Sequence, residues 1–120
     1  YGGDAGIYMD DFSGLSSKVT VYATSNDYSG ESMTNPMVPA KYKKTDKNLP
    51  VKVGRHVVVG CASVVLPGVN IEEGCSVGAM TLCNKSMEAF GVYAGVPAKR
   101  IKERKRTLLE LEKQLREELE

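Results

Sequence analysis

Only a few side chains of this 120-residue chain could act as a general base near neutral pH. His56 is the single histidine, and the ordinary pKa of a histidine, about 6.5, suits proton transfer. Asp27 and Glu31 are carboxylates in a polar stretch, and a subunit boundary could raise the pKa of either into a useful range. A zinc centre made of three histidines from one chain is excluded, because the chain has one.

Anion binding is a second possible chemistry, indicated by basic residues that crowd one short stretch. They are Lys99, Arg100, Lys102, Arg104, Lys105 and Arg106. At the start of a helix each charge would be misplaced by about 0.3–1 kcal/mol, because the helix macrodipole favours anions there. Phosphates of a bound ligand, or carboxylates of a neighbouring subunit, would offset the misplacement. The net charge is only +1 and no aromatic residues are interleaved, so we expect no nucleic-acid partner.

The cysteines indicate the compartment rather than a disulfide framework. Cys61, Cys75 and Cys83 are odd in number and form no CxxC pair, which is typical of reduced thiols in a cytoplasmic protein. No apolar run is long enough to span a bilayer, and no signal peptide precedes the first residues. We therefore expect a cytoplasmic protein without a membrane span.

The elements that must position these side chains follow a six-residue period. One apolar row is Val53, Val59, Val65, Ile71, Val77 and Cys83, and the row four residues further on is Val57, Ser63, Val69, Cys75, Thr81 and Met87. The same period appears upstream at Met9, Leu15 and Val21. Helices have a period of 3.6 and strands a period of 2, so six indicates a solenoid instead. We predict an all-β parallel β-helix with three units in each triangular coil and Gly54, Gly60 and Gly78 at tight corners.

Two segments interrupt or end this pattern. Residues 27–50 contain prolines, turn formers and lysines, and we expect them to form a long loop excursion from the coil. The coil domain then covers residues 1–97, and residues 98–120 are predicted to form a C-terminal α-helix that begins near Pro97. A leucine stripe along this helix predicts packing on the coil or on a neighbouring subunit: Leu108, Leu111, Leu115 and Leu119.

Three short motifs give the chain a family resemblance. LPGV (66–69), VGA (77–79) and AGVPAK (94–99) resemble, in order and spacing, the terminal signature of the hexapeptide-repeat acyltransferases. The DDFSGLSS and NDYSGESMTNP segments look most like the sugar O-acetyltransferases of the maltose, galactoside and surface-polysaccharide type. The resemblance implies a left-handed parallel β-helix, a homotrimer, and transfer of an acetyl or other acyl group from coenzyme A to a sugar hydroxyl.

The resemblance also implies a coenzyme A groove. Cys61, Ala79, Asn84 and Lys85 match positions that line the groove in the family, and Lys99 and Lys102 match basic positions near the coenzyme. Gly78 adds a small corner that would admit the pantetheine arm, although a coil corner needs a small residue in any case. The family transfers the acyl group directly, so Cys61 is not expected to be a nucleophile.

The catalytic base departs from the family pattern. The family carries a histidine at the mouth of the long loop, whereas the stretch from Asn26 to Glu31 has none. His56 and Asp27 are the remaining candidate bases, and the simpler expectation for His56 is an exposed, non-catalytic side chain. Two functions stay open: an acetyl-CoA-dependent O-acetyltransferase, or a non-catalytic trimeric scaffold of the same fold, with or without bound coenzyme A.

Overall fold

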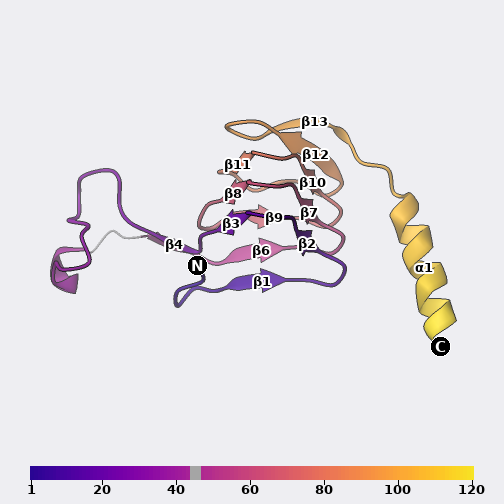
Figure 1. Cartoon of the computed structure of the whole chain (residues 1–120), viewed down its shortest axis with the longest axis horizontal. Helices are drawn as coiled ribbons and strands as arrows, with labels where there is room; N and C mark the ends of the chain where they lie inside the picture. Colours follow the sequence, from indigo (N-terminus) through magenta and orange to yellow (C-terminus); the bar gives the residue numbers. More distant parts are fainter. Residues whose placement is uncertain (44–46) are drawn as a thin grey trace.

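Three stacks of short strands form the body of the chain (Figure 1). The computed structural model describes residues 1–43 and 47–120. The first sheet consists of β1 (Ile7–Met9), β6 (Val51–Val53) and β9 (Asn70–Ile71), and the third of β3 (Thr20–Val21), β8 (Val64–Val65) and β11 (Leu82–Cys83). The second sheet consists of β2 (Gly14–Leu15), β7 (Val58–Val59), β10 (Ser76–Val77), β12 (Gly91–Ala94) and β13 (Lys99–Glu103). From β1 to β3 and from β6 to β11, consecutive strands belong to different sheets, so the chain passes through the three sheets in turn, whereas β12 and β13 form a hairpin within the second sheet.

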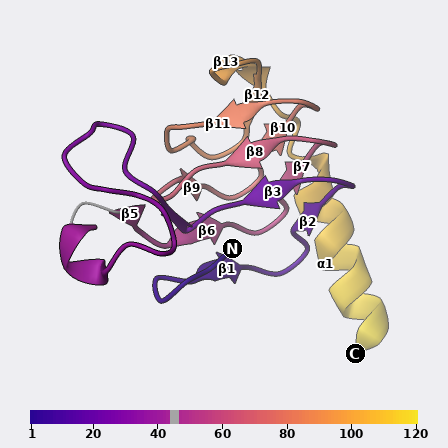
Figure 2. The same ribbon diagram turned by 60° about the vertical axis from the view of Figure 1, so that its left-hand side comes forward.

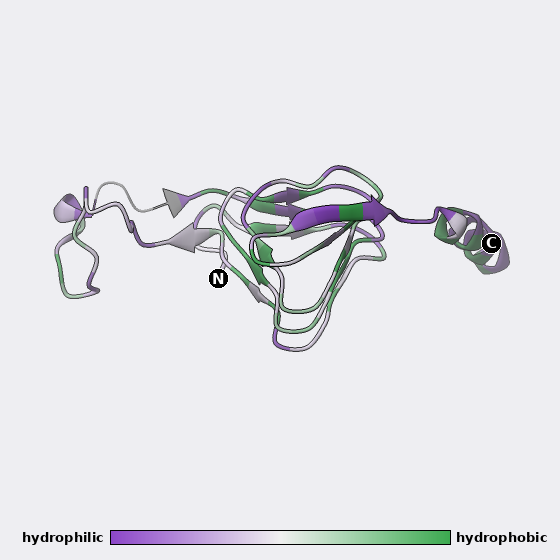
Figure 3. Cartoon of the chain, turned by 90° about the horizontal axis from the view of Figure 1, so that it is seen from above, coloured by the Kyte–Doolittle hydropathy of each residue, from purple (hydrophilic) through white to green (hydrophobic). Residues whose placement is uncertain are grey.

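The chain returns to the same sheet after 18 residues, which is three six-residue units. Parallel pairs with this separation are Lys52 with Asn70, Val58 with Ser76, and Val64 with Leu82. Seen from above, the stacks enclose a three-sided outline (Figure 3). The six-residue period therefore places one strand on each side, as predicted from the sequence.

Both periodic rows point into the space between the three sheets. Every residue of the downstream rows that begin at Val53 and Val57 is buried. Upstream, Met9 and Leu15 pair in register with Val53 and Val59, as the shared period predicts. They are nevertheless 46% and 37% exposed, because β1 and β2 are edge strands and only one neighbouring strand covers each of them.

The corners differ from the prediction in where the left-handed backbone occurs. The second position of the unit, with Gly54, Gly60 and Gly78, was expected to turn the chain, but none of these glycines has a positive φ. The fourth position turns instead, with φ between 56° and 81°, at His56, Ala62, Gly68, Gly74 and Met80. Glycine is required at Gly60 for a different reason: a Cβ there would lie 2.6 Å from the Ala79 nitrogen of the next turn.

Gly60→Ala is therefore expected to lower the free energy of unfolding by about 1–3 kcal/mol, because backbone atoms must move to admit the methyl group. Urea denaturation would measure the change. Gly14→Ala is the matched control, since a Cβ at Gly14 meets no atom within 4 Å. Equal stability of the two variants would contradict close stacking at Gly60.

The C-terminal segment corrects the predicted helix. The sequence predicts helix from Ala98, but Lys99–Glu103 forms β13, antiparallel to β12, and α1 spans Thr107–Leu119. The reason is the free edge of the second sheet, because pairing of β13 satisfies N–H and C=O groups that β12 would otherwise leave exposed. No helix within the described residues has both the length and the apolar character needed to cross a membrane.

The predicted loop excursion leaves after the third sheet and begins with a short two-stranded neck. Strand β4 (Thr24–Ser25) pairs antiparallel with β5 (Lys47–Asn48), and a short 3-10 helix, η1 (Ala40–Tyr42), lies further out. Residues 44–46 of the predicted excursion lie outside the described residues. We call residues 24–48 the arm. The arm and α1 project from opposite sides of the stacks (Figures 1 and 2).

Candidate functional site

The chain turns from one sheet to the next at three corners, which differ in the elements that lie beside them. Residues 10–13, 54–57 and 72–75 connect the first sheet to the second beside α1, and we call them the helix corner. Residues 16–19, 60–63 and 78–81 connect the second sheet to the third and form the cysteine corner. Residues 22–23, 66–69 and 84–86 follow the third sheet, where the arm departs, and form the arm corner.

Several predicted groove residues gather at the cysteine corner. Cys61 and Ala79 occupy equivalent places there in successive turns, and Gly78 precedes Ala79. Ala94 lies directly against this corner, since a Cβ on Gly78 would be 3.2 Å from the Ala94 Cβ. Ala94 in turn pairs with Lys99 of β13. The structure therefore brings the cysteine corner close to Lys99 at the start of β13.

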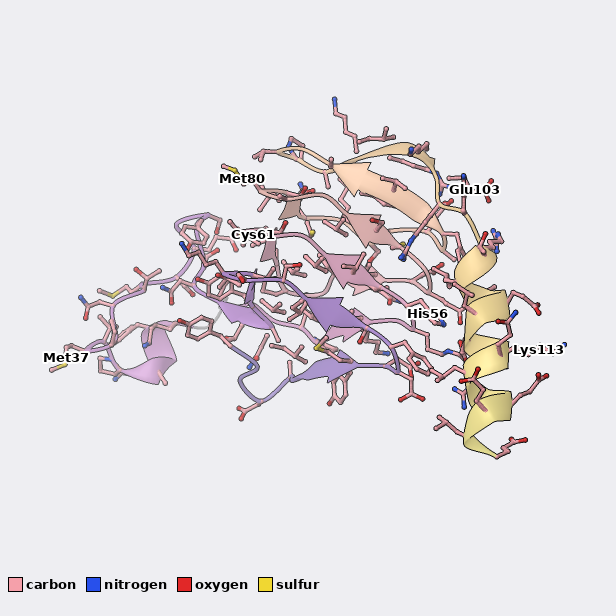
Figure 4. The ribbon with its side chains drawn as sticks, turned by 45° about the vertical axis from the view of Figure 1, so that its right-hand side comes forward. Met37, His56, Cys61, Met80, Glu103 and Lys113 are labelled. Atoms are coloured by element: carbon pink, nitrogen blue, oxygen red, sulfur yellow. The ribbon has the colours of Figure 1, made fainter. Side chains whose placement is uncertain are left out.

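The remaining predicted residues lie elsewhere. Asn84 and Lys85 belong to the arm corner, and Lys102 pairs with Val92 further along the hairpin. His56 belongs to the helix corner, and Figure 4 shows it on the α1 side of the molecule, away from Cys61. The structure does not place His56 beside the predicted groove.

His56 takes part in a latch that holds α1 against the helix corner. The buried carboxylate of Glu112 lies 2.5 Å from His56 Nε2, accepts a hydrogen bond from Arg116 Nε at 2.6 Å, and pairs with the Arg55 guanidinium. Hydrogen bonds from His56, Arg116 and Arg55 lower the pKa of Glu112 from 4.5 to about 2. The His56 ring also stacks on Phe12, with centroids 5.2 Å apart. We call these five residues the Glu112 latch.

The latch corrects the expectation of an exposed His56. Its side chain is only 11% exposed, because α1, more than fifty residues away in the sequence, covers the outside of the corner. The contact between His56 Nε2 and Glu112 supports a docking role. A catalytic role for His56 stays a prediction.

Residues 104–106, between β13 and α1, also attach the helix to the helix corner. Arg104 Nη1 donates hydrogen bonds to the carbonyl oxygens of His56, at 2.6 Å, and Gly74, at 3.1 Å. The Arg104 N–H donates to the Phe90 carbonyl oxygen at 2.6 Å, and the Arg106 guanidinium lies 4.2 Å from the centroid of the Phe90 ring. No local pattern in the sequence predicts the hydrogen bonds of the Arg104 side chain, because the His56 and Gly74 carbonyl groups that accept them are thirty or more residues away.

The start of α1 reduces the predicted misplacement of charge. Lys99, Arg100 and Lys102 belong to β13 rather than to the first turn of a helix. The helix carries Glu110 in its first turn and Arg116 in its last, which the macrodipole favours, whereas Arg106 at the N-cap and Glu117 and Glu118 in the last turn have the opposite arrangement.

Acidification is expected to release α1 as the pH falls from about 4.5 toward about 2. The pKa of Glu112 in the folded chain lies below its ordinary value, so its ionised form stabilises docking above pH 4.5, and this contribution disappears as the group is protonated. A free helix of 13 residues is marginal in water, so far-ultraviolet circular dichroism would report the release. We expect Glu112→Gln to lose helix signal at neutral pH and Glu117→Gln, on the exposed side, to keep it. A wild-type signal in Glu112→Gln would contradict the latch.

Asp27, the other candidate base, lies on the arm just beyond β4. Its carboxylate is buried and accepts hydrogen bonds from the Ser29 hydroxyl at 2.7 Å, the Ser29 N–H at 3.1 Å and the Ser32 N–H at 3.1 Å. Charge-assisted bonds of this kind hold a carboxylate in one orientation. The carboxylate of Asp27 is therefore held in one orientation, and it lies close to the neck from which the arm extends.

A cavity of about 520 Å³ opens at the arm corner next to Asp27. Its aromatic wall consists of Tyr1, Tyr22 and Tyr28, of which Tyr1 and Tyr22 stack with centroids 5.0 Å apart. The remaining lining residues are Thr24, Ser25, Asn26, Leu66, Pro67 and Asn84. Asn84 is thus the predicted groove residue that faces this cavity. Mixed aromatic, apolar and amide linings of this kind are typical of small-molecule sites.

The thiols do not supply a nucleophile from the interior. Cys61, Cys75 and Cys83 are all free, and the latter two are buried. Burial raises the pKa of Cys75 and raises that of Cys83 to about 11, so both thiols stay protonated near neutral pH. Within the described ranges, no group of three His, Cys, Asp or Glu side chains is placed to hold a metal ion.

Comparison with known sequences identifies similar enzymes, although no protein-family model matches the chain. The chain is 42% identical over 110 residues to dTDP-4-amino-4,6-dideoxy-D-glucose acyltransferase of Escherichia coli, covering 92% of this chain and 57% of the relative. It is 36% identical over 52 residues to chloramphenicol acetyltransferase of Klebsiella aerogenes, covering 43% of this chain and 25% of that enzyme.

Solved structures agree with the sequence comparison. AntD, an N-acyltransferase from Bacillus cereus in complex with dTDP and 3-hydroxybutyryl-CoA, has a TM-score of 0.95 and 40% identity, covering 99% of this chain and 63% of AntD. Galactoside acetyltransferase in complex with coenzyme A has a TM-score of 0.70 and 24% identity, covering 88% of this chain and 48% of that enzyme, which shows a shared fold alone. The chain spans less than two thirds of the length of both the Escherichia coli relative and AntD.

Structures of AntD have also been solved with one aspartate or one serine replaced.

The matches that cover most of this chain are the Escherichia coli sugar acyltransferase and AntD, and the fold extends to the galactoside enzyme. The resemblance inferred from the repeat and its motifs is thereby confirmed: the homologues of this chain are sugar acyltransferases of the hexapeptide-repeat type.

Proposed function

We propose that this chain transfers an acyl group from an acyl-CoA thioester to the amine of a nucleotide-linked amino sugar. The observation that carries the proposal is the 42% identity, across 92% of the chain, to an acyltransferase of dTDP-4-amino-4,6-dideoxy-D-glucose. The sequence predicts an acyl-CoA donor, acetyl-CoA above all, and a sugar hydroxyl acceptor. We keep the donor and replace the hydroxyl with an amine, because AntD is an N-acyltransferase.

An amine acceptor accounts for the absence of a histidine at the mouth of the arm. A neutral amine attacks a carbonyl with its own lone pair, whereas a hydroxyl needs a base to remove its proton during attack. In the transfer a C–N bond forms, the C–S bond of the thioester breaks, nitrogen loses one proton and coenzyme A leaves as a thiolate. We assign Asp27 to hold the amine and to receive the proton from nitrogen, since its carboxylate is already oriented at the arm. The proton then passes by way of water to the thiolate, which leaves Asp27 ionised for the next transfer.

We place the donor along the cysteine corner and the hairpin above it. The groove residues predicted from the sequence are retained in this proposal: Cys61, Gly78 and Ala79 at the cysteine corner, Lys99 and Lys102 on β13, and Asn84 and Lys85 at the arm corner. Ala79 is small and exposed, so the pantetheine arm can approach the backbone closely there, while the small Gly78 lets Ala94 pack against the same corner. Lys99 and Lys102 are exposed on β13, where their ammonium groups could pair with phosphates of the coenzyme.

We also propose that the winding is a left-handed parallel β-helix and that three copies associate. The predicted boundary at residue 97 is moved, because β13 belongs to the second sheet, so the coil domain extends to residue 103 and α1 is the separate element. Outward positions on the second and third sheets are small or largely apolar: Gly14, Val58, Ser76, Val92, Thr20, Val64 and Leu82. Such rows favour burial against another copy. A stable monomer in sedimentation would contradict the trimer.

The free thiols favour the cytoplasm as the compartment.

Calorimetric titration with acetyl-CoA and 3-hydroxybutyryl-CoA tests the donor site, and mass spectrometry after addition of dTDP-4-amino-4,6-dideoxyglucose tests the transfer. We expect saturable binding and an acylated sugar nucleotide. Binding without acylation of any acceptor would favour the non-catalytic scaffold, and absence of binding would overturn the donor site. Transfer to a galactoside hydroxyl but not to the amine would restore the O-acetyltransferase prediction.

A further inference from the structure

We propose that the cavity at the arm corner is the subsite for the sugar ring of the acceptor, and that its Tyr28 and Leu66 select a 6-deoxy sugar over its 6-hydroxy analogue. The inference rests on the proposed function and deepens it. It assigns a specificity role to residues that neither the motifs nor the relatives point out.

The chemistry of the lining suits a neutral sugar ring. None of the side chains that line the cavity is charged. No side chain of the lining offers a cation to the diphosphate of a sugar nucleotide, so we place the charged part of the acceptor outside the cavity. Asn26, Asn84 and Thr24 offer amide and hydroxyl groups to sugar hydroxyls, while the tyrosine rings offer flat apolar faces.

The cavity lies where the amino-sugar acceptor and the acyl-CoA donor would have to meet for the transfer. Asn26 and Tyr28 line it, whereas Asp27 between them does not and carries the carboxylate that we assign to the acceptor amine. Asn84, which also lines the cavity, belongs to the groove assigned to the donor. A sugar ring in the cavity would therefore lie beside the segment that carries Asp27 and against the groove that supplies the acyl group.

Selection at C6 follows from the apolar part of the wall. Leu66 and Pro67 present no hydrogen-bonding side chain, and Tyr28 contributes a ring that is 91% exposed in the free chain. A methyl group at C6 gains by burial against this wall, whereas a hydroxyl group would lose water without gaining a hydrogen bond from Leu66, Pro67 or the face of the Tyr28 ring. Differences of this kind amount to about 10- to 100-fold in kcat/KM, since an apolar pocket rejects an added hydroxyl only moderately.

The experiment compares kcat/KM for dTDP-4-amino-4,6-dideoxyglucose and for its 6-hydroxy analogue. We expect the wild type to prefer the 6-deoxy sugar by about 10- to 100-fold. Tyr28→Ala should lose most of this preference, and so should Leu66→Asn, which adds an amide partner for the hydroxyl. Tyr42→Ala is the matched control, because Tyr42 is also exposed on the arm, at 51%, but does not line the cavity.

The outcomes separate the subsite from the function on which it rests. If the wild type acylates the amino sugar but both variants keep its preference, the subsite is overturned and the proposed function stands. If the wild type acylates neither sugar, saturation-transfer NMR still reports whether the sugar protons contact the protein. Contact that Tyr28→Ala weakens and Tyr42→Ala does not would support the subsite alone, and no contact would overturn both.

Discussion

Replacing Asp27 with asparagine is expected to lower kcat/KM for amino-sugar acylation by about 10²- to 10⁴-fold, the usual contribution of a positioned acid–base group. The asparagine keeps the volume and can still accept a hydrogen bond from the loop, but it carries no negative charge and receives no proton. The measurement is the rate of formation of the acylated sugar nucleotide, with calorimetric titration of acyl-CoA to show that donor binding persists.

Two controls sharpen this prediction. Glu31→Gln removes an exposed carboxylate from the same arm and should leave the rate near that of the wild type. His56→Ala should reduce the helix signal in circular dichroism more than it reduces the transfer rate, because His56 belongs to the Glu112 latch. A wild-type rate in Asp27→Asn together with a large loss in His56→Ala would transfer the role of base to His56.

Replacing Ile71 with alanine is expected to lower the free energy of unfolding by about 2–5 kcal/mol. Ile71 is completely buried, pairs with Val53 in one turn and bridges to Met87 in the next, so truncation of its side chain leaves a cavity among buried core residues. Urea denaturation, followed by circular dichroism, measures the change at a fixed protein concentration.

Ile101→Ala is the matched control for Ile71→Ala. Ile101 is 62% exposed on β13, so its truncation should change the free energy of unfolding by no more than about 0.5 kcal/mol. If Ile101→Ala cost as much as Ile71→Ala, then the outward face of the hairpin would be buried in an assembly. If Ile71→Ala cost nothing, then the interior rows would not be the core of the chain.

The sequence by itself determined the architecture of the stacks. Each unit of six residues repeats the same local requirement: one apolar residue faces inward, and another follows four positions later. Because the pattern recurs every three units, the partner of Val59 in the next turn follows from the sequence as Val77. Its pairing with Leu15 on the other side does not follow, because it depends on where the chain returns after the arm. The sequence also predicts that the chain leaves the coil near residue 27, since the period stops there.

Only the tertiary structure decided which functional residues meet. A period of six shows that His56 and Cys61 lie near corners, but not that α1 returns to cover His56 with the carboxylate of Glu112. Residues 99–103 have the composition of a helix, yet the free edge of β12 draws them into a strand. The cavity beside Asp27 likewise combines the arm with turns of the coil more than thirty residues away. Contacts between distant segments leave no periodic trace in the chain, because each occurs once and depends on where the stacked turns bring its partners together.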